Sequence, residues 1–245
     1  MRIGIDATAL PPEPVGAGNY IIQLVRALSS LNSEDEWVIF AQKHARDLID
    51  LPTSDRLDWR IIPDQSPAHR LVWEQISLPA LVYKSQVELL HSPHYTRPIR
   101  LPCASVVTFH DMTFFLYPHL HTRVKRLFFP GMIRISARRA DALIAVSEQT
   151  RLDAIRILHL SQEKITTIPL GIHPDFHPIQ DQTALQACRE KYRLPQTFIL
   201  YVGLVEPRKN LPVLLKAYHL LLQKQSPPPL VIAGRMGWGA QEVEQ

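Results

Sequence analysis

Residues 142–146 read Ala-Leu-Ile-Ala-Val, five apolar residues in a row. A β-strand that is covered by helices on both faces needs this composition, because neither face meets water. Ser147, the next residue, is a preferred helix N-cap, and apolar residues recur at helical spacing from there to Leu160. A buried strand followed by an amphipathic helix is typical of a βαβ unit. The stretch therefore predicts an α/β fold with a parallel sheet.

The same alternation extends in both directions from this stretch. Short apolar runs are separated by longer amphipathic segments, such as a predicted helix from Asn19 to Leu31. We therefore expect a Rossmann-like parallel-sheet domain over residues 1–172. Its expected strands are Arg2–Ala7, Trp37–Ala41, Asp58–Ile62, Val87–His91, Ser105–Phe109, Ala142–Val146 and Lys164–Ile168.

The pattern lapses between residues 171 and 181, where two prolines interrupt the periodicity. We interpret residues 173–195 as a linker and connecting helix, and residues 196–245 as the start of a second Rossmann-like domain. Two strands and one helix cannot cover both faces of a parallel sheet, so we expect this domain to be incomplete and the chain to be truncated at its C-terminus. The elements expected here are helices over Thr183–Tyr192 and Pro212–Gln223 and strands over Phe198–Val202 and Leu230–Ala233.

The composition is that of an ordinary globular protein. Of the 245 residues 46% are apolar, which is enough for a sizeable core, and the net charge is only +4. We find neither a signal peptide nor an apolar run of membrane-spanning length. The two cysteines, Cys103 and Cys188, lack the spacing of a metal site. These features predict a protein of a reduced, cytoplasmic compartment that is soluble or peripheral on the inner membrane face.

A glycine-containing loop follows the first expected strand and reads Pro14-Val15-Gly16-Ala17-Gly18-Asn19-Tyr20. Gly16 and Gly18 let the backbone approach a ligand closely, and the helix that follows offers unpaired N–H groups to an anion. The loop is not the dinucleotide fingerprint, because Ile21 stands where the third glycine belongs. A flexible strand–helix turn is the alternative interpretation.

A His-Asp pair, His110 and Asp111, ends the expected strand Ser105–Phe109. Ligands of open parallel sheets bind beyond the carboxyl ends of the strands. A neutral imidazole at such a position can accept a proton or a hydrogen bond from a substrate. We therefore take both residues as candidate catalytic groups, with a turn histidine and a capping aspartate as the alternative.

Two adjacent cations, Arg208 and Lys209, precede the helix expected at Pro212. Positive side chains beside a helix N-terminus suit a diphosphate. A solvated charged turn is the alternative.

Taken together and in this order, these segments resemble glycosyltransferase family 4, a family of group 1 glycosyltransferases. The resemblance includes Ala-Asp-Ala-Leu-Ile-Ala-Val-Ser-Glu at 140–148, Ile-Pro-Leu-Gly-Ile at 168–172 and Val-Gly-x-x-Glu-Pro-Arg-Lys-Asn at 202–210. Within the family, the chain looks similar to bacterial mannosyltransferases of surface polysaccharide assembly.

The resemblance implies the two-domain GT-B architecture and a retaining, metal-independent transfer of a hexose, with no cofactor. The donor would be a nucleotide-sugar, with GDP-mannose as the candidate, and the acceptor a glycan or a lipid-linked sugar. By the family pattern Arg208 and Lys209 would bind the donor diphosphate, which the amides of Gly16 and Gly18 would also meet. His110 would lie near the sugar and the acceptor.

The chain departs from the family pattern in two places. Leu204 stands where many relatives have an arginine, and the family's paired glutamates would lie beyond residue 245. We therefore expect little or no transfer by the chain alone. A non-catalytic or split-enzyme subunit, which binds acceptor or membrane and needs a second chain, is the alternative function.

A basic segment, residues 121–139, contains no carboxylate. A basic amphipathic helix can lie on anionic lipid, which would suit a lipid-linked acceptor, and a core-packing helix with a solvated face is the alternative. Pro130-Gly131 is expected to kink or split this helix. The basic residues of the segment are Arg123, Lys125, Arg126, Arg134, Arg138 and Arg139.

Two other classes of protein fit the sequence less well. Nucleic-acid binding is not expected, because the positive charge is local and no known module supports it. A hydride-transferring Rossmann enzyme is disfavoured by the missing third glycine and by Gln42, where an acidic residue would end the second strand.

Overall fold

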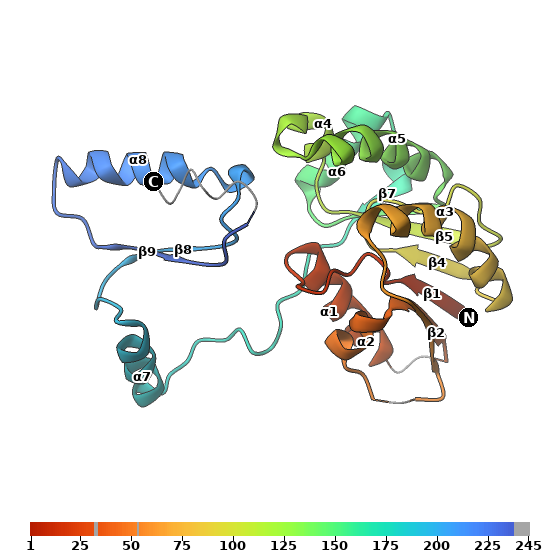
Figure 1. The fold of residues 1–245 in the computed structure, drawn as a ribbon, viewed down its shortest axis with the longest axis horizontal. Coiled ribbons are helices and arrows are strands. Elements are labelled where there is room, and N and C mark those ends of the chain that lie inside the picture. The colour runs from red at the N-terminus through yellow and green to blue at the C-terminus, as the bar shows by residue number, and fades with distance from the viewer. Residues whose placement is uncertain (32–33, 53, 238–245) are drawn as a thin grey trace. The chain divides into compact units, whose positions relative to one another are not determined.

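The computed structural model describes residues 1–31, 34–52 and 54–237 (Figure 1). The chain forms two compact units, Met1–His173 and Pro174–Gln245. Each unit has a sheet of its own.

The first unit is built on a parallel sheet with the strand order β3-β2-β1-β4-β5-β6-β7. Every strand expected over residues 1–172 is present, and all neighbouring strands pair in parallel. The carboxyl ends of the strands therefore meet at one edge, here called the carboxyl edge. The strands are β1 (Arg2–Asp6), β2 (Glu36–Gln42), β3 (Leu57–Ile62), β4 (Leu89–Ser92), β5 (Ala104–Phe109), β6 (Ala142–Ala145) and β7 (Ile165–Thr167).

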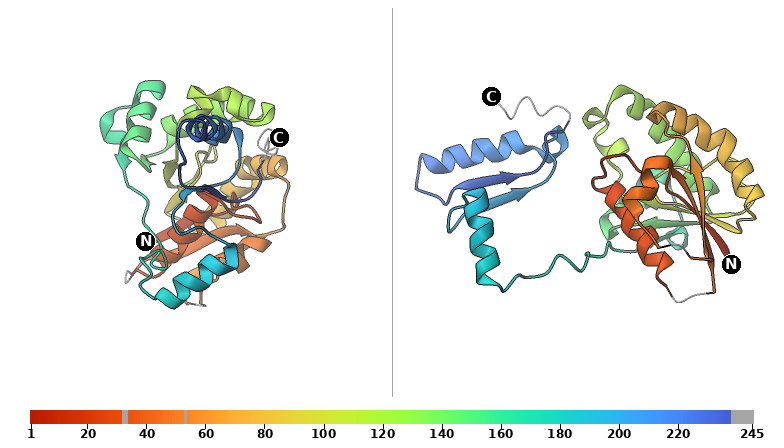
Figure 2. Two further views of the ribbon diagram at one scale, coloured as in Figure 1. Left: turned by 90° about the vertical axis from the view of Figure 1, so that its left-hand side faces the viewer. Right: turned by 60° about the horizontal axis from the view of Figure 1, so that its bottom comes forward.

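Helices cover both faces of this sheet (Figures 1 and 2). In β2, Ile39 packs in one apolar cluster with α1 and α2, whereas Val38 and Phe40 pack in another with α3. This alternation is the two-residue period of a strand, and it explains why β2 is apolar at successive positions. The helices are α1 (Ala17–Ser29), α2 (Lys43–Ile49), α3 (Pro67–Lys84), α4 (Thr113–Leu116), α5 (Arg123–Arg139) and α6 (Glu148–Leu158), with 3₁₀ turns η1 (Pro118–Leu120) and η2 (Gln162–Lys164).

Ser147 caps α6 as the sequence predicts, because its hydroxyl accepts a hydrogen bond from the Thr150 amide. The expected split at Pro130-Gly131 is wrong, since α5 runs without a break from Arg123 to Arg139. Pro130 removes one backbone hydrogen bond from the helix. Phe129 and Ile133, on either side of it, are buried in the core cluster of β5 and β6, and this packing holds the helix together.

The second unit has the four elements that the sequence predicts. Helix α7 (Gln182–Tyr192) is capped by Asp181, whose carboxylate accepts from the amides of Thr183 and Ala184. Strands β8 (Ile199–Val202) and β9 (Leu230–Ala233) pair in parallel, and α8 (Leu211–Leu222) connects them after the 3₁₀ turn η3 (Pro207–Lys209). Val205 and Leu211 form the buried centre of this unit.

Candidate active site at the carboxyl edge

Three segments of the first unit place polar and aromatic side chains at the carboxyl edge. They are the first turns of α1, the segment after β4 and the segment after β5. Strands β4 and β5 are neighbours in the sheet, with Ser92 opposite Val107, so the residues that follow them lie side by side. Tyr20 reaches the same place from α1, because its hydroxyl lies 3.3 Å from the Thr108 hydroxyl.

His110 follows β5 and has its ring orientation fixed by the backbone. Its Nε2 lies 2.8 Å from the carbonyl oxygen of Pro93. A carbonyl oxygen only accepts, so Nε2 carries the hydrogen and Nδ1 of the neutral ring keeps the lone pair. Burial lowers the pKa of His110 below its ordinary value. The imidazole is therefore neutral at neutral pH, and its Nδ1 can accept a proton or a hydrogen bond.

Aromatic rings surround this imidazole. The ring centroid of His110 lies 5.0 Å from that of Tyr20, 5.6 Å from that of Tyr95 and 5.9 Å from that of His94. The Tyr20 and Tyr95 contacts are edge-on. Aromatic and imidazole groups at a strand end suit a sugar, which offers both apolar C–H faces and hydroxyl groups.

His94 is a residue of this site that the sequence did not reveal. Burial lowers its pKa to about 3, and its Nδ1 is buried without a hydrogen-bond partner among the described residues. The signal that could have found it is its position, two residues beyond the carboxyl end of β4.

His91, the third residue of β4, contacts Thr108 of the neighbouring strand. Its Nε2 is 2.9 Å from the Thr108 hydroxyl, which also faces Tyr20. Burial lowers the pKa of His91 to about 4 and raises the pKa of Tyr20. Both groups are therefore uncharged at neutral pH and add no charge to the site.

Asp111 has a local structural role. Its Oδ1 accepts from the amide of Thr113 at 3.0 Å and from the Thr113 hydroxyl at 2.6 Å. Because that hydroxyl gives its hydrogen to a carboxylate, it accepts from Nε2 of His121, 3.0 Å away. Asp111 thus closes the turn into α4, which was the alternative that the sequence left open. A part for Asp111 in catalysis stays a prediction.

The structure distinguishes the two glycines of the first loop. Gly16 has φ +46°, a conformation that favours glycine, and stands one turn before Tyr20, whose amide donates to the Gly16 carbonyl. The Gly18 amide donates to the Val15 carbonyl at 2.8 Å, and a Cβ at Gly18 would lie 3.0 Å from Pro14. The predicted phosphate contact of Gly18 would therefore require this hydrogen bond to break, and loop packing explains why position 18 is a glycine.

Arg208 and Lys209 lie in the second unit, at the predicted helix start. They form η3, directly before α8, and Asn210 between the two elements has φ +52°. Both side chains are exposed, and the Arg208 guanidinium pairs with the Glu206 carboxylate at 2.8 Å. The structure thus places both cations beside a helix N-terminus, and their part in diphosphate binding stays a prediction.

Within the described residues, no group of three or more histidine, cysteine, aspartate or glutamate side chains is arranged to hold a metal ion. Over the same residues, none of the helices combines the length and apolarity needed to cross a bilayer.

Comparison with known proteins assigns the chain to a family. Residues 14–176 match Glycosyltransferase Family 4. The chain is 30% identical over 240 residues to the O-antigen chain mannosyltransferase B of Escherichia coli. The aligned region covers 91% of this chain and 61% of that protein. It is also 31% identical over 163 residues to the serotype-specific mannosyltransferase WbdA of Escherichia coli, covering 63% of this chain and 20% of WbdA.

A solved structure shows the same fold. Anabaena Alr3699/HepE, crystallised with UDP and glucose, superposes with a TM-score of 0.67 at 16% sequence identity, over 100% of this chain and 64% of that chain. The chain thus spans about three fifths of the length of the first relatives that it matches. Its α/β architecture is that of GT-B glycosyltransferases, and the chain belongs to glycosyltransferase family 4.

Proposed function

We propose that this chain supplies the acceptor side, and part of the donor side, of a retaining hexosyltransferase. It moves mannose from GDP-mannose to a glycan or lipid-linked acceptor in cell-surface polysaccharide synthesis. The observation that carries the proposal is His110, a neutral imidazole with its Nδ1 lone pair available, set among aromatic rings at the carboxyl edge. The names of the Escherichia coli relatives support mannose as the sugar and a polysaccharide as the product.

On the acceptor side, His110 accepts a hydrogen bond from the attacking hydroxyl. Because Nε2 donates to Pro93, the contact is made by Nδ1. Tyr20 and His94 bound the same space and orient the sugar ring through edge and face contacts. These groups exclude water from the reacting hydroxyl and hold it in one orientation.

On the donor side, Arg208 and Lys209 bind the diphosphate and neutralise its charge as the glycosidic bond breaks. In the first unit, the backbone N–H groups at the start of α1, next to Gly16, suit an anionic group of the donor. Alr3699/HepE was crystallised with UDP and glucose, which supports a nucleotide-sugar as the donor class. No metal or cofactor is part of this proposal, because two side-chain cations balance the leaving-group charge.

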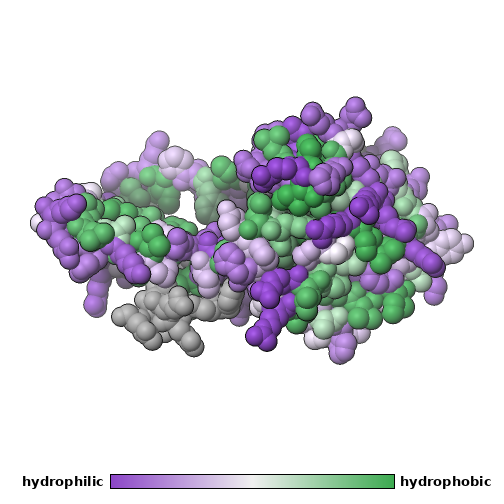
Figure 3. Space-filling model, turned by 90° about the horizontal axis from the view of Figure 1, so that it is seen from above, coloured by the Kyte–Doolittle hydropathy of each residue, from purple (hydrophilic) through white to green (hydrophobic). Residues whose placement is uncertain are grey.

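The start of α5 brings the acceptor side to a membrane surface. Val124 and Leu127 are 68% and 84% exposed, and they stand among Arg123, Lys125 and Arg126. Figure 3, which looks at the molecule from above, shows apolar surface among hydrophilic side chains over the upper part of the first unit. Apolar residues ringed by cations suit an anionic lipid surface, such as the cytoplasmic face of a bacterial membrane.

Sugar transfer tests the proposal directly. The protein that contains this chain is incubated with bacterial membranes as the acceptor source and with radiolabelled GDP-mannose or UDP-glucose. We expect label from GDP-mannose in glycolipid or polysaccharide, with the anomeric configuration of the donor retained in the product by NMR. Label from UDP-glucose alone would refute mannose as the sugar, an inverted anomer would refute retention, and no label from either donor would refute the transferase proposal.

A further inference from the structure

The segment between His94 and Thr96 has a strained backbone. The Thr96 amide donates to the His94 carbonyl at 2.6 Å, which closes a three-residue turn around Tyr95. Tyr95 has φ +59°, in the left-handed region that residues with a side chain seldom adopt. A γ-turn with a positive φ at its centre is rare and strained, and such strain persists only where the surroundings impose it.

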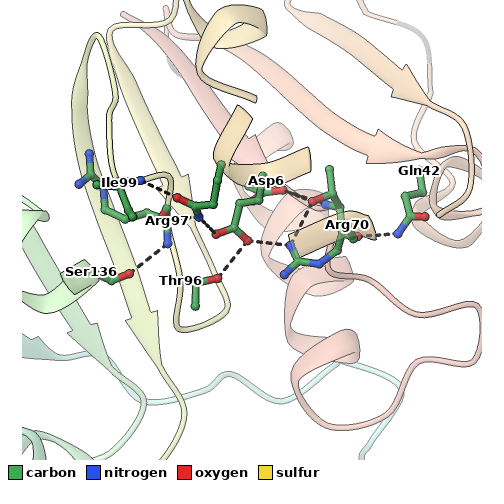
Figure 4. A network of polar contacts seen from close by, with 10 residues as sticks. Asp6, Gln42, Arg70, Thr96, Arg97, Ile99 and Ser136 are labelled. Carbon is green, nitrogen blue, oxygen red and sulfur yellow. Dashed lines mark hydrogen bonds and ion pairs between the residues drawn. The ribbon is translucent and has the colours of Figure 1, made fainter. Parts of the chain in front are cut away.

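Helix α3 holds the segment that leaves this turn. The Thr96 hydroxyl donates to Oε2 of Glu74 at 3.0 Å. The side chain of Gln75 donates to the Arg97 carbonyl at 3.3 Å and accepts from the Ile99 amide at 2.9 Å. Figure 4 shows these contacts converging on the segment from Thr96 to Ile99. Two consecutive residues of α3, Glu74 and Gln75, therefore fix the Thr96 side chain and the backbone that follows it.

The anchor is itself buried and charged. Nη1 of Arg70, one helical turn before Glu74, lies 2.9 Å from the Glu74 carboxylate and 3.5 Å from the Thr8 hydroxyl. Both partners of this ion pair are almost fully buried. A buried ion pair is seldom more stabilising than well-packed apolar residues of the same volume. Stability alone therefore does not explain why this ion pair is present. Its use in holding hydrogen-bonding groups in fixed positions does.

We propose that Glu74 and Gln75 are positioning residues for His110. They hold the turn around Tyr95 in its strained conformation, and the turn presents the Pro93 carbonyl to which His110 Nε2–H donates. The same turn places the Tyr95 hydroxyl, which accepts from the Asp111 amide at 3.1 Å. The segment that α3 anchors thus contacts both the ring of His110 and the backbone amide that follows it. This inference rests on the proposed function, since it concerns the same imidazole.

Proton exchange at His110 tests the proposal without any substrate. The chain is labelled with ¹⁵N-histidine, and water exchange of the Nε2–H proton is measured by NMR in the wild type, Gln75→Leu, Thr96→Val and Thr96→Ser. Gln75→Leu removes two anchor contacts, and Thr96→Val removes the hydroxyl that Glu74 binds, whereas Thr96→Ser keeps it. We expect exchange at His110 to be about tenfold faster in the first two variants and unchanged in Thr96→Ser, because exchange follows local opening.

Two controls make the measurement decisive. Gln149→Leu makes the same chemical change on α6, where the amide donates only to Asp153 of the same helix among the described contacts, and it should leave His110 unaffected. The ring of His91, which belongs to β4 rather than to the turn, is the internal reference. Unchanged exchange at His110 in both anchor variants would overturn the proposal, as would equal acceleration at His91 and His110, which would indicate general loosening.

Because the measurement needs neither donor nor acceptor, it separates this proposal from the proposed function. A chain that transfers no sugar can still show the expected exchange at His110, and an active protein can fail to show it.

Discussion

At the scale of single residues, the environment decides what each candidate group can do. His110 and Asp111 are adjacent in the sequence, yet one keeps a lone pair at the carboxyl edge and the other closes a turn. The role of His110 depends on Pro93, 17 residues away in the sequence, whereas that of Asp111 depends on Thr113, only 2 residues further on. Each candidate side chain therefore needs a prediction and a measurement of its own.

Replacing His110 with alanine is expected to lower kcat/KM for sugar transfer about a hundredfold, which is the usual effect of losing a proton-accepting group. The fold should be retained, because the ring is at the edge of the sheet. Steady-state kinetics and thermal melting of the protein that contains this chain check both expectations. His119→Ala, at an exposed histidine of η1, is the matched control and should be silent. Near-normal kinetics in His110→Ala would remove this residue from the mechanism.

Arg208→Ala and Lys209→Ala should each lower kcat/KM for the nucleotide-sugar roughly a hundredfold, since a charge-assisted contact to the leaving diphosphate contributes about 2–4 kcal/mol to the transition state. Lys209→Arg should restore only part of the activity, because a planar guanidinium and an ammonium fill space differently. Lys216→Ala, an exposed change within α8, is the control. If both alanine variants keep normal donor kinetics, the turn is a solvated loop.

His91 should make the stability of the first unit depend on pH. Its pKa falls from 6.5 in the unfolded chain to about 4 in the fold, so below pH 6.5 the unfolded chain binds more protons and stability is lost as the pH falls. Between pH 7 and pH 5 the free energy of unfolding should drop by about 2 kcal/mol from this group. Urea unfolding of the wild type and of His91→Asn at both values measures this. An equal drop in the two proteins would contradict the assignment.

At the scale of elements, the sequence predicts best those parts whose surroundings are uniform. Strands β2 and β6 are covered on both faces, so they are apolar at nearly every position and are readily identified. Neither α2 nor α3 was predicted from the sequence. In α3 the inward positions 70 and 74 are charged, and an ion pair that is buried cannot be recognised from periodicity. His94 was missed for a related reason, since its ring partners His110 and Phe129 come from the segment after β5 and from α5, and only its position beyond β4 marks it in the sequence.

The first turns of α5 provide a test of membrane contact. Leu127→Ser should weaken binding to anionic phospholipid vesicles about tenfold, because a leucine that enters the lipid contributes about 1.5–3 kcal/mol. The fold should be unaffected, since the side chain is 84% exposed. Vesicle co-sedimentation at low and high salt measures the binding. Leu220→Ser, an exposed leucine of the second unit, is the control, and equal binding of the wild type to neutral and anionic vesicles would contradict the proposed surface.

At the scale of the whole molecule, the chain consists of two units with separate sheets. The first unit contains the three large apolar clusters, whereas the described core of the second consists of two buried residues with two partly buried neighbours. The two units should therefore differ in their resistance to unfolding. The sequence indicates such a division, because the periodicity lapses where the prolines lie.

Limited proteolysis should reveal this division. Phe176, in the segment that follows His173, is 81% exposed, so chymotrypsin should cut there first. The N-terminal fragment should unfold in one cooperative transition, because its sheet is complete without the second unit. Mass spectrometry and circular dichroism of the fragment measure these outcomes. Early cuts inside residues 57–109, before any cut near Phe176, would contradict this division.

The strained turn around Tyr95 has a consequence for how such proteins tolerate mutation. Tyr95, held at φ +59° by the contacts that its neighbour Thr96 makes with α3, relaxes when those contacts weaken, and relaxation releases strain. Substitutions at Gln75 or Thr96 should therefore pass any screen for solubility or heat resistance more easily than core substitutions do. Natural or laboratory variants selected for abundance would then include well-folded but inactive proteins with substitutions at these two positions. Screens for activity, by contrast, should find both positions among the least tolerant outside the residues that touch substrate.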